Sequence, residues 1–343
     1  MPSAPAGAPR VPSLDSVLTI IVWALVAAVV GLGGWFGYTV WVNTNQSRLA
    51  TPALRSIEGL KAMARRSPND ITIRIRLGEA LGQAGMYDEA VQQLTQALNI
   101  DRKHTGALLD LGLIAAQRNE WNTAESYFQR VADLTDGIEY ANVNDQRETA
   151  LYYLGECALR SRRYEDAISW FKAALRIRRD AADTYLEMAS AYKGMGDLDA
   201  ALKQLEIGVT FDPTYAQAFY EMGQIYSSKK DVVNAASCYA KSAELAPDAE
   251  QPKEALASLG TADEWKARAV ASLKENKVAD AVDEVLVARM LAPKDVSLAK
   301  LHAQIAEKKG DKKSALAIWK EAEQLAPSDQ DIKAAIKRLS SER

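Results

Sequence analysis

The sequence contains little of what catalytic and metal sites require. Its 343 residues include two cysteines and two histidines, and no cluster of these residues has metal-ligand spacing. There is no glycine-rich phosphate loop, no nucleophile elbow and no paired His and Cys arrangement. Gly194 and Gly196 have no strand before them and predict a turn. These absences argue against an enzyme, and we expect no catalytic residue, no metal and no cofactor.

A strong excess of charge of one sign is also missing. The formal net charge is -3 and charged residues make up 25% of the chain. Nucleic-acid binding usually requires a concentrated basic face, so we expect no nucleic-acid partner. The six arginines between residues 160 and 179 fit a solvated surface balanced by neighbouring acids. A contact for an acidic partner or for lipid headgroups is the alternative.

Alanine recurs along the chain at intervals of 34, 43, 34, 34, 46 and 34 residues. Each of these alanines is followed four residues later by a bulky apolar side chain, and three residues further by a mostly small one. This spacing places all three on one face of an α-helix, and a matching apolar stripe upstream predicts a second helix in each unit. The alanines are Ala90, Ala124, Ala167, Ala201, Ala235, Ala281 and Ala315.

This pattern resembles the tetratricopeptide repeat, a helix-turn-helix unit of 34 residues with small residues at positions 8 and 20 and a leucine or aromatic residue at position 24. The resemblance implies an all-α fold, a right-handed α-solenoid of about seven helix pairs closed by capping helices. Units six and seven depart from the pattern, with Arg268 and His302 where earlier units have leucine or methionine. The predicted units begin at Ile71, Thr105, Glu148, Ala182, Ala216, Ala262 and Val296.

The remaining segments complete the predicted domain organisation. Residues 1–13 form a disordered tail rich in proline and alanine, 14–43 a single transmembrane helix, 44–70 a linker and half-repeat helix, 71–249 units one to five, 250–261 a linker and the favoured flexing point, 262–329 units six and seven, and 330–343 a C-terminal capping helix.

The transmembrane prediction rests on the uncharged run from Val17 to Val42, which has 26 residues. At about 1.5 Å per residue, such a helix exceeds the roughly 30 Å hydrocarbon core. A cleaved signal peptide is the alternative, although its apolar region is usually shorter. Basic residues are more frequent after this run, which favours repeats on the cytoplasmic side of a bacterial cytoplasmic membrane and leaves the other side open. Gly33 and Gly37 form a small-xxx-small pair for homo-oligomer packing, with passive anchoring as the alternative.

Cys157 and Cys238 lie in helical stripes of different units. Free buried thiols are therefore favoured over a disulfide.

The resemblance also implies a concave groove lined by the first helix of each unit. Tyrosine, amide and carboxylate groups there suit a peptide or helix, and packing against a neighbouring helix is the alternative for each tyrosine. In the last two units the same positions turn basic, with Lys266, Lys274, Lys300 and Lys308. The predicted groove residues are Glu79, Gln83, Leu109, Leu113, Tyr152, Glu156, Arg160, Tyr220 and Gln224.

Together these features favour a membrane-tethered scaffold that binds protein or peptide partners along the groove, in the assembly of a membrane-associated complex. The lysine and asparagine pair with which some repeats of this family clamp a chaperone tail is missing from every unit, so that ligand is not expected. A permanent structural subunit without an exchangeable ligand is the alternative.

Overall fold

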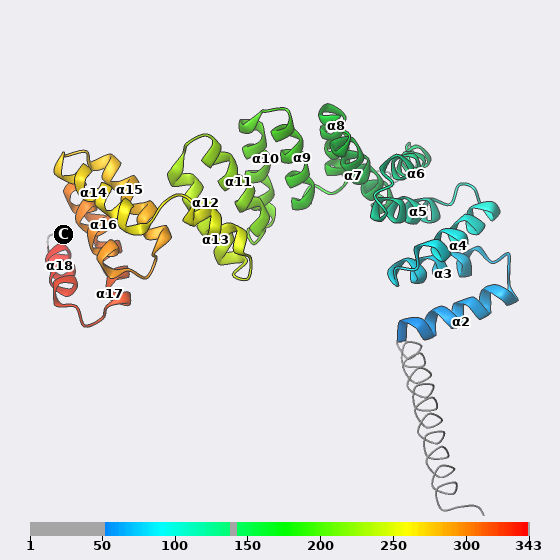
Figure 1. Cartoon of the computed structure of the whole chain (residues 1–343), viewed down its shortest axis with the longest axis horizontal. Helices are drawn as coiled ribbons and strands as arrows, with labels where there is room; N and C mark the ends of the chain where they lie inside the picture. Colours follow the sequence, from blue (N-terminus) through cyan, green and yellow to red (C-terminus); the bar gives the residue numbers. More distant parts are fainter. Residues whose placement is uncertain (1–51, 138–142, 342–343) are drawn as a thin grey trace, which may run out of the picture. The chain divides into compact units, whose positions relative to one another are not determined.

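The computed structural model describes residues 52–137 and 143–341, and the regular structure in these two stretches is helical (Figure 1). The chain divides into two compact parts, Met1–Arg118 and Asn119–Arg343. We call these parts unit 1 and unit 2, in numerals, and keep the words unit one to unit seven for the individual repeats. The helices are α2 (Pro52–Arg66), α3 (Ile71–Gln83), α4 (Tyr87–Ile100), α5 (Thr105–Gln117), α6 (Trp121–Leu134), α7 (Asp145–Arg160), α8 (Tyr164–Ile177), α9 (Ala182–Gly194), α10 (Leu198–Phe211), α11 (Ala216–Ser228), α12 (Val232–Leu245), α13 (Glu250–Ala257), α14 (Ala262–Lys274), α15 (Val278–Leu291), α16 (Val296–Lys309), α17 (Lys312–Leu325) and α18 (Gln330–Ser341).

Among the described helices, unit 1 contains α2 to α5. Helix α2 packs on α3, α3 on α4 and α4 on α5. Ile57 and Ala64 of α2 are buried, so this helix covers the start of the repeats as the half-repeat prediction expects. The Asp70 side chain accepts hydrogen bonds from the backbone N–H groups of Thr72 and Ile73 and so caps the start of α3.

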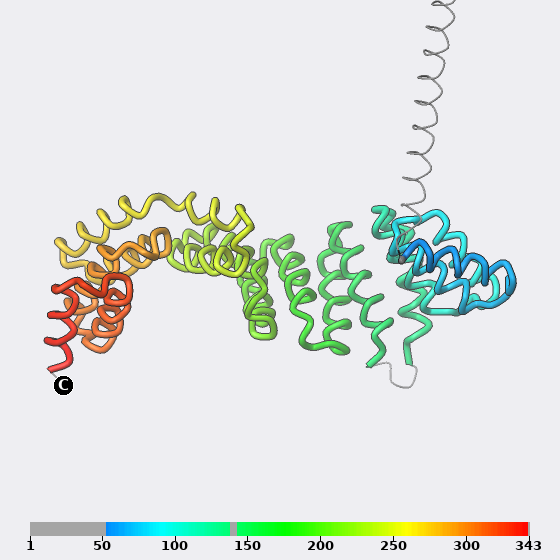
Figure 2. Tube along the Cα trace, turned by 90° about the horizontal axis from the view of Figure 1, so that it is seen from below, coloured from blue at the N-terminus to red at the C-terminus, as the bar shows by residue number. Residues whose placement is uncertain are grey.

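Unit 2 shows the alternation of first and second helices over most of its length. Helices α7 and α8, α9 and α10, α11 and α12, α14 and α15, and α16 and α17 pack as pairs, and Figure 2 traces them from green to red. Four first helices begin at the predicted residues, and α7 begins at Asp145 rather than at Glu148. The division between the two units falls between α5 and α6, the helices of the predicted second repeat.

The recurring alanine is the best-buried position of the repeat. All seven of these alanines have a relative exposure of 0%, and the bulky residue four positions later is buried in every unit. Phe128 and Phe171 are fully buried examples, and burying one such side chain stabilises the fold by roughly 1.5–3 kcal/mol. The helix pairs therefore pack through the face that the sequence period predicts.

The small residue at position 8 allows the two helices of a pair to approach closely. A Cβ atom added at Gly155 would lie 2.4 Å from the Phe171 ring, and one added at Gly223 would lie 2.5 Å from the Tyr239 ring. In these two pairs the glycine thus makes room for the aromatic ring of the second helix.

The turn between the two helices of each unit uses one residue with positive φ. This residue occupies position 15 of all seven predicted units, and φ ranges from 57° to 85°. Glycine or asparagine adopts this conformation readily, yet two units place arginine or lysine there. The residues are Gly85, Asn119, Arg162, Gly196, Lys230, Asn276 and Gly310.

Residues 250–261 differ from the linker that we predict from the sequence. Glu250–Ala257 form α13, which packs on α12, and α12 also packs on α15. Pro252 lies in the first turn of α13 and is buried, a position at which proline has no helical hydrogen bond to break. The extra residues therefore form a short helix against the second helix of unit five.

The structure accommodates the polar residues Arg268 and His302 of units six and seven in different ways. Arg268 is exposed, and its guanidinium lies 4.5 Å from the centre of the Trp265 ring. His302 Nδ1 lies 2.9 Å from Arg289 Nη1. Burial and the nearby arginine lower the pKa of His302 to about 4, so its imidazole is neutral at pH 7. Both helices keep the repeat geometry despite these substitutions.

The free state of the cysteines is confirmed, since both Cys157 and Cys238 are buried and unbonded to sulfur. At the end of unit 2, Ile332, Ala335 and Leu339 of α18 are buried, as expected for a capping helix. The predicted tail, the membrane helix at 14–43 and its Gly33 and Gly37 pair lie outside the described residues. Within the residues that are described, no helix is long and apolar enough to cross a membrane.

Candidate functional site

A cleft of about 360 Å³ lies on the first helices of unit 1. Helix α3 contributes Glu79 and Gln83 to its wall, and α5 contributes Asp110 and Leu113. Tyr87, at the start of α4, lines the same cleft. The structure therefore brings together three of the predicted groove residues, Glu79, Gln83 and Leu113. We refer to this site as the unit 1 cleft.

Asp110 gives the unit 1 cleft its electrostatic character. Burial and the neighbouring Glu79 raise the pKa of the Asp110 carboxyl to about 6. Its Oδ2 atom is buried and has no hydrogen-bond partner within the described part of the chain. The cation at the edge of this region is engaged elsewhere, since Arg118 pairs with Asp88 at 2.6 Å and lies 5.7 Å from the centre of the Tyr87 ring.

A second cleft, of about 520 Å³, lies on the first helices of unit 2. Helix α7 contributes Glu156 and Arg160, and α9 contributes Glu187 and Lys193. Tyr164, at the start of α8, closes one side. Two predicted groove residues, Glu156 and Arg160, thus face a common space. We refer to this site as the unit 2 cleft.

Glu187 is the most perturbed carboxylate of the unit 2 cleft. Burial and then the nearby Glu156 raise its pKa to about 7, against the opposing effect of Arg160. Burial also raises the pKa of Glu156, which Arg160 again opposes. At neutral pH this pair therefore carries less negative charge than two exposed carboxylates would.

Three basic side chains line the unit 2 cleft, Arg160, Arg162 and Lys193, and two of them contact other side chains. The Arg160 guanidinium lies 4.1 Å from the centre of the Trp121 ring, a cation–π distance. Lys193 pairs with Glu221 at 2.5 Å. Across the described residues, no ion pair within 4.0 Å joins either Glu156 or Glu187 to a cation.

The two clefts occupy the same register of the repeat. Glu79 and Glu156 both stand at position 9 of their units, and Asp110 and Glu187 both stand at position 6 of the unit that follows. The tyrosine wall is equivalent too, because Tyr87 and Tyr164 share position 17. One arrangement of two carboxylates and a tyrosine has therefore formed twice.

The other predicted groove residues lie outside the two clefts. Leu109 and Gln224 are half-buried. The Tyr152 ring centre lies 5.9 Å from that of Phe171, and the Tyr220 ring centre lies 5.9 Å from that of Tyr239. Both tyrosines thus pack on the second helix of their own unit, and burial raises the pKa of Tyr152.

Two of the basic groove positions in the last two units contact the neighbouring repeat. Lys266 donates to the Ser297 hydroxyl at 2.6 Å, and Lys308 donates to the Leu273 carbonyl at 2.8 Å. Lys300 pairs within unit seven, with Asp329 at 2.6 Å. Lys266 and Lys308 therefore link units six and seven as well as giving the surface its charge.

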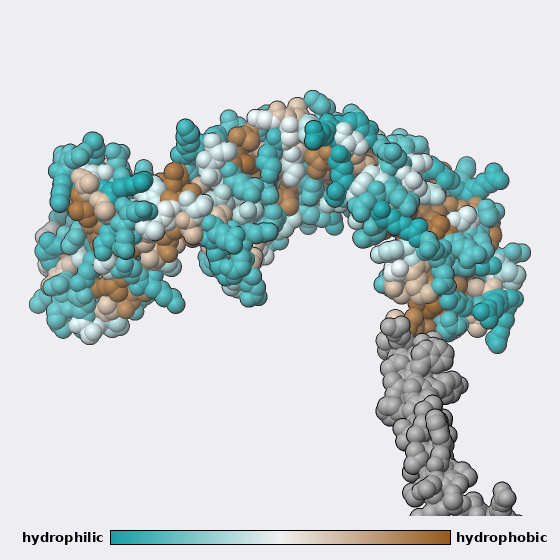
Figure 3. Space-filling model, in the orientation of Figure 1, coloured by the Kyte–Doolittle hydropathy of each residue, from teal (hydrophilic) through white to brown (hydrophobic). Residues whose placement is uncertain are grey.

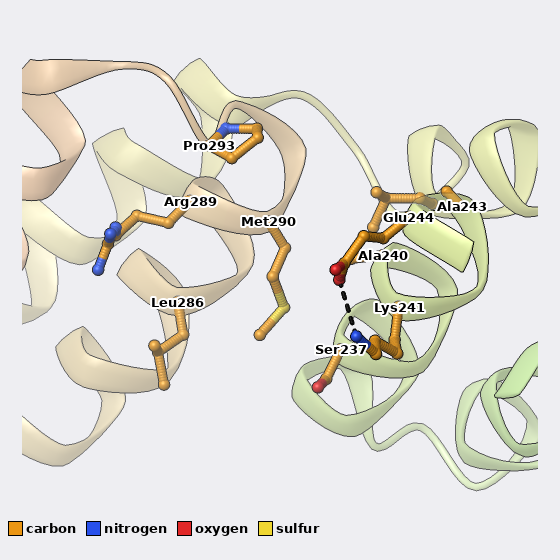
Figure 4. A pocket seen from close by; sticks show the side chains of 10 residues that line it. Ser237, Ala240, Lys241, Ala243, Glu244, Leu286, Arg289, Met290 and Pro293 are labelled. Atoms are coloured by element: carbon orange, nitrogen blue, oxygen red, sulfur yellow. Dashed lines mark hydrogen bonds and ion pairs between the residues drawn. The ribbon is translucent and has the colours of Figure 1, made fainter. Parts of the chain in front are cut away.

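A third cavity, of about 730 Å³, lies away from the first helices. Figure 4 shows Leu286 and Met290 of α15 facing Lys241 of α12 across it. Lys241 pairs with Glu244 at 3.1 Å, and Leu256 of α13 also lines the space. Sequence reasoning gave no sign of this cavity, which is lined by α12, α13 and α15.

Residues of the kind used in catalysis and metal binding have structural roles here. The His104 side chain accepts from the Ala107 N–H at the start of α5, and Asp197 caps α10 in the same way, as its sequence position predicts. Among the described residues, no group of three or more His, Cys, Asp or Glu side chains is placed to hold a metal ion.

Asp110, Glu187 and the two wall tyrosines, Tyr87 and Tyr164, line the clefts but are not among the residues predicted from the sequence. A signal for Asp110 was present, because it is the only charged residue in Thr105–Gln117. No comparable signal marked Glu187, since its helix carries other charges. On the face drawn in Figure 3, hydrophilic residues dominate and hydrophobic residues form small separate patches.

The packing and turn geometry define a protein built from helical repeats with accessible first helices. Tetratricopeptide repeat models match residues 105–180, residues 158–225, and residues 71–104 and 216–249. Together they cover 71–249, just over half of the chain. The chain belongs to the tetratricopeptide repeat family, whose members act as protein-interaction scaffolds.

Two curated human proteins are similar to parts of this chain. Cell division cycle protein 16 homolog of Homo sapiens is 26% identical over 124 residues, which are 36% of this chain and 20% of that protein. Protein O-mannosyl-transferase TMTC3 of Homo sapiens is 23% identical over 171 residues, 49% of this chain and 18% of that protein. This chain thus spans about a fifth of the length of these relatives.

Solved structures with a similar fold include a peptide-binding repeat protein and a yeast protein. YrrB, described as a TPR protein with an unusual peptide-binding site, is 20% identical, with a TM-score of 0.47 over 58% of this chain and 98% of that one. Yeast Tom70 is 16% identical, with a TM-score of 0.48 over 84% of this chain and 58% of that one.

Proposed function

We propose that this protein is a membrane-tethered, non-enzymatic scaffold that binds protein partners or peptide segments along its first helices, in the assembly of a membrane-associated complex. The observation that carries the proposal is the formation of two clefts at one repeat register. They collect five of the nine predicted groove residues, Glu79, Gln83, Leu113, Glu156 and Arg160. Such surfaces suit an extended segment because polar groups fix its register while the apolar walls contribute contact area.

The tether rests on the sequence. The uncharged run of 26 residues from Val17 to Val42 is long enough for one membrane span, and the linker and half-repeat segment 44–70 joins it to the first repeat. Such an anchor raises the local concentration of the scaffold near membrane-bound partners.

A permanent structural subunit is the second candidate. The Lys193–Glu221 pair and the Lys308–Leu273 hydrogen bond show that groove positions also join neighbouring repeats. In a permanent subunit the first-helix surface would hold a fixed neighbour, and no exchangeable peptide would enter the clefts. Exchange of the partner is therefore the property that separates the two functions.

Site-specific photo-crosslinking tests the scaffold function in the full chain. A crosslinking side chain at Arg160 or Gln83, both exposed, should capture a partner protein. The same side chain at Lys172, exposed on the second helix α8, is the matched control and should not. Equal crosslinking from Lys172, or none from either cleft, would contradict the proposal.

Partner exchange completes this test. Unlabelled partner added to the extracted complex before illumination should reduce the crosslink to the original partner, because a scaffold releases its ligand. Crosslinking that persists unchanged would favour the permanent subunit. Replacing Glu156 and Gln224 with alanine should weaken the crosslinks while circular dichroism stays unchanged. Tyr152 and Tyr220 are left intact because they pack on the second helices.

The membrane side is tested separately by protease treatment of intact cells or spheroplasts with a tag at the carboxyl end. Protection until lysis is expected for repeats on the cytoplasmic side, which the basic residues after the apolar run favour. Digestion from outside would reverse the orientation.

A further inference from the structure

Helix α2, the first described helix of unit 1, has one side inside the protein. It packs on α3 (Figure 1). Ile57 and Ala64 are buried, and Leu60 between them is half-buried. This spacing places the three on one side of the helix. Lys61, on the same side, pairs with Glu89 at 2.9 Å. The side of α2 that faces the repeats is therefore fully used in packing.

The opposite side of α2 is exposed and carries no acidic residue. A Cβ atom added at Gly59 would meet nothing within 4 Å, and the Met63 side chain is 50% exposed. The other exposed residues here lie at helical spacing from these two. We refer to the set as the outward face of α2, and it consists of Arg55, Gly59, Ala62, Met63 and Arg66.

Positive charge dominates α2 as a whole. The helix contains four basic residues and one acidic residue, Glu58. Glu58 lies 3.6 Å from Lys61, whose charge Glu89 also meets. Arg66 forms no ion pair among the described residues. The positive charge of α2 is therefore concentrated on and beside its outward face, which favours contact with an anionic surface.

The capping helix α18 shows that an exposed methionine between arginines is not needed to close a repeat array. A cap requires a polar outer side. In α18, Ile332, Ile336 and Leu339 are all buried or half-buried, and the exposed residues include the acidic Asp331. Arg338 is held by an ion pair within the array. The outward face of α2 thus has an apolar group and a charge excess that capping leaves unexplained.

The chain that precedes α2 determines which surface lies within its reach. Nine residues, 43–51, separate the uncharged run Val17–Val42 from α2. Fully extended, they span at most about 30 Å. With the run in a membrane, α2 stays within that distance of the lipid headgroups, so its effective concentration at the membrane surface is high. Because α2 has 15 residues and packs on α3, it suits a position on the membrane and not across it.

We propose that the outward face of α2 lies on the anionic headgroups of the membrane that holds the tether. Arg55 and Arg66, at the two ends of this face, bind lipid phosphates, to which a guanidinium donates in a planar fork. Met63 between them inserts toward the acyl chains. The proposal rests on the tether of the proposed function. It adds that the first repeat is held against the membrane surface and does not hang from a free linker.

Fluorescence quenching tests the proposal on the full chain in lipid nanodiscs. An environment-sensitive dye is attached to Met63→Cys, and a nitroxide on the lipid acyl chain close to the headgroup quenches a dye that reaches the lipid. Ala334→Cys, exposed on α18, is the matched control site. Burial raises the pKa of Cys157 to about 12 and that of Cys238 to about 11, so both native thiols resist labelling. The chain without an added cysteine gives the background.

Anionic lipid should strengthen the contact. In discs with about 30% phosphatidylglycerol, we expect quenching at position 63 to be about threefold stronger than in discs of phosphatidylcholine alone. Position 334 should be quenched in neither.

Charge variants localise the effect to α2. Arg55→Gln combined with Arg66→Gln should remove most of the difference between the two lipids at position 63. Lys333→Gln combined with Lys337→Gln takes the same charge from exposed positions of α18 and should leave that difference unchanged. Circular dichroism of each variant checks that the fold is kept.

Two patterns of quenching would overturn the proposal. Equal quenching at position 63 in the two lipids would show that anionic headgroups do not hold α2, and an outward face that binds an acidic protein would give this result. Equal losses in the α2 and α18 charge variants, or equal quenching at positions 63 and 334, would show attraction of the whole chain to the lipid.

Failure of the tether gives a different result. A chain that does not enter the nanodiscs would overturn the tether and this proposal with it. Crosslinking from Arg160 and Gln83 would still decide whether the clefts bind a partner. A chain that enters the discs and shows no lipid-dependent quenching would overturn the α2 contact alone.

Discussion

The cleft of unit 1 and the cleft of unit 2 have carboxylates at the same repeat positions, yet their other walls differ. Gln83 in the first corresponds to Arg160 in the second, and Leu113 corresponds to Ser190. A positive charge therefore lies beside the acidic pair in unit 2 and a neutral amide lies there in unit 1. The repeat thus fixes the acidic pair, while each unit sets the charge around it separately.

The largest expected effect comes from adding a side chain at Gly155, where α7 crosses α8 beside the unit 2 cleft. Gly155→Val should lower the free energy of unfolding by about 3 kcal/mol, because even a Cβ atom would lie 2.4 Å from the Phe171 ring. Urea unfolding followed by circular dichroism measures the change. Gly82→Ala in the unit 1 cleft is the control, since its Cβ would lie 3.8 Å from Ile114. A loss of similar size in Gly82→Ala would refute the close-packing account.

The buried carboxylates should make stability depend on pH. The pKa of Glu187 rises from its ordinary 4.5 to about 7, so the folded chain holds this proton more tightly than the unfolded chain. The free energy of unfolding should therefore fall as pH rises from about 4.5 to 7, and Glu187→Gln should remove roughly 2 kcal/mol of that fall. Asp110→Asn should act over a lower window, from 3.8 to about 6. Thermal unfolding across this pH range tests both, and coincident windows would contradict the assignment.

Exchanging Gln83 and Arg160, the residues beside the two acidic pairs, should reverse the difference in charge between the clefts. Arg160→Gln should raise the pKa of Glu156 and Glu187 further, because Arg160 opposes the raised pKa of both. Gln83→Arg should lower the pKa of Asp110 in unit 1, by the equivalent of about 1 kcal/mol for one partly exposed charge. Titration of the carboxyl groups followed by NMR measures each change. Shifts of the same sign in both variants would contradict the electrostatic account.

The smallest expected effect concerns the turn that borders each cleft. Position 15 is Gly85 in unit one and Arg162 in unit three, and both have positive φ. Arg162→Gly should stabilise the chain by about 0.5 kcal/mol. Glycine removes the strain of a side chain on a left-handed backbone, and the greater flexibility of glycine in the unfolded state offsets part of this gain. Gly85→Ala should have the opposite sign. Unfolding midpoints in urea would show these changes, and destabilisation by Arg162→Gly would be the contrary result.

The fold was predictable because its determinants are local and periodic. The seven alanines and the bulky residues that follow them mark one helix face, and every first helix but α7 begins at the predicted residue. Helix α13 was missed because eight residues are too few to show a helical period. Helix α13 can begin at Glu250 because Pro252 lies in its first turn, where proline breaks no helical hydrogen bond.

The clefts were predictable only in part. Glu79, Gln83, Leu113, Glu156 and Arg160 followed from the repeat positions that the family uses. Asp110 and Glu187 stand at position 6, and their effect depends on burial between neighbouring helices. The single-sequence pattern does not specify that burial. Leu109, Tyr152, Tyr220 and Gln224 lie outside the clefts, and for both tyrosines this follows from packing on a second helix.

Helix α13 has a consequence for how stability is transmitted along the array. In a stacked repeat protein each unit is stabilised mainly by the interface with its neighbour, so cooperativity passes from one interface to the next. Here α13 packs on α12, and α12 also packs on α15. The link between units five and six therefore runs through second helices and the cavity lined by Leu256 and Met290. Filling or enlarging that cavity would adjust whether units six and seven unfold together with the preceding repeats or as a separate block.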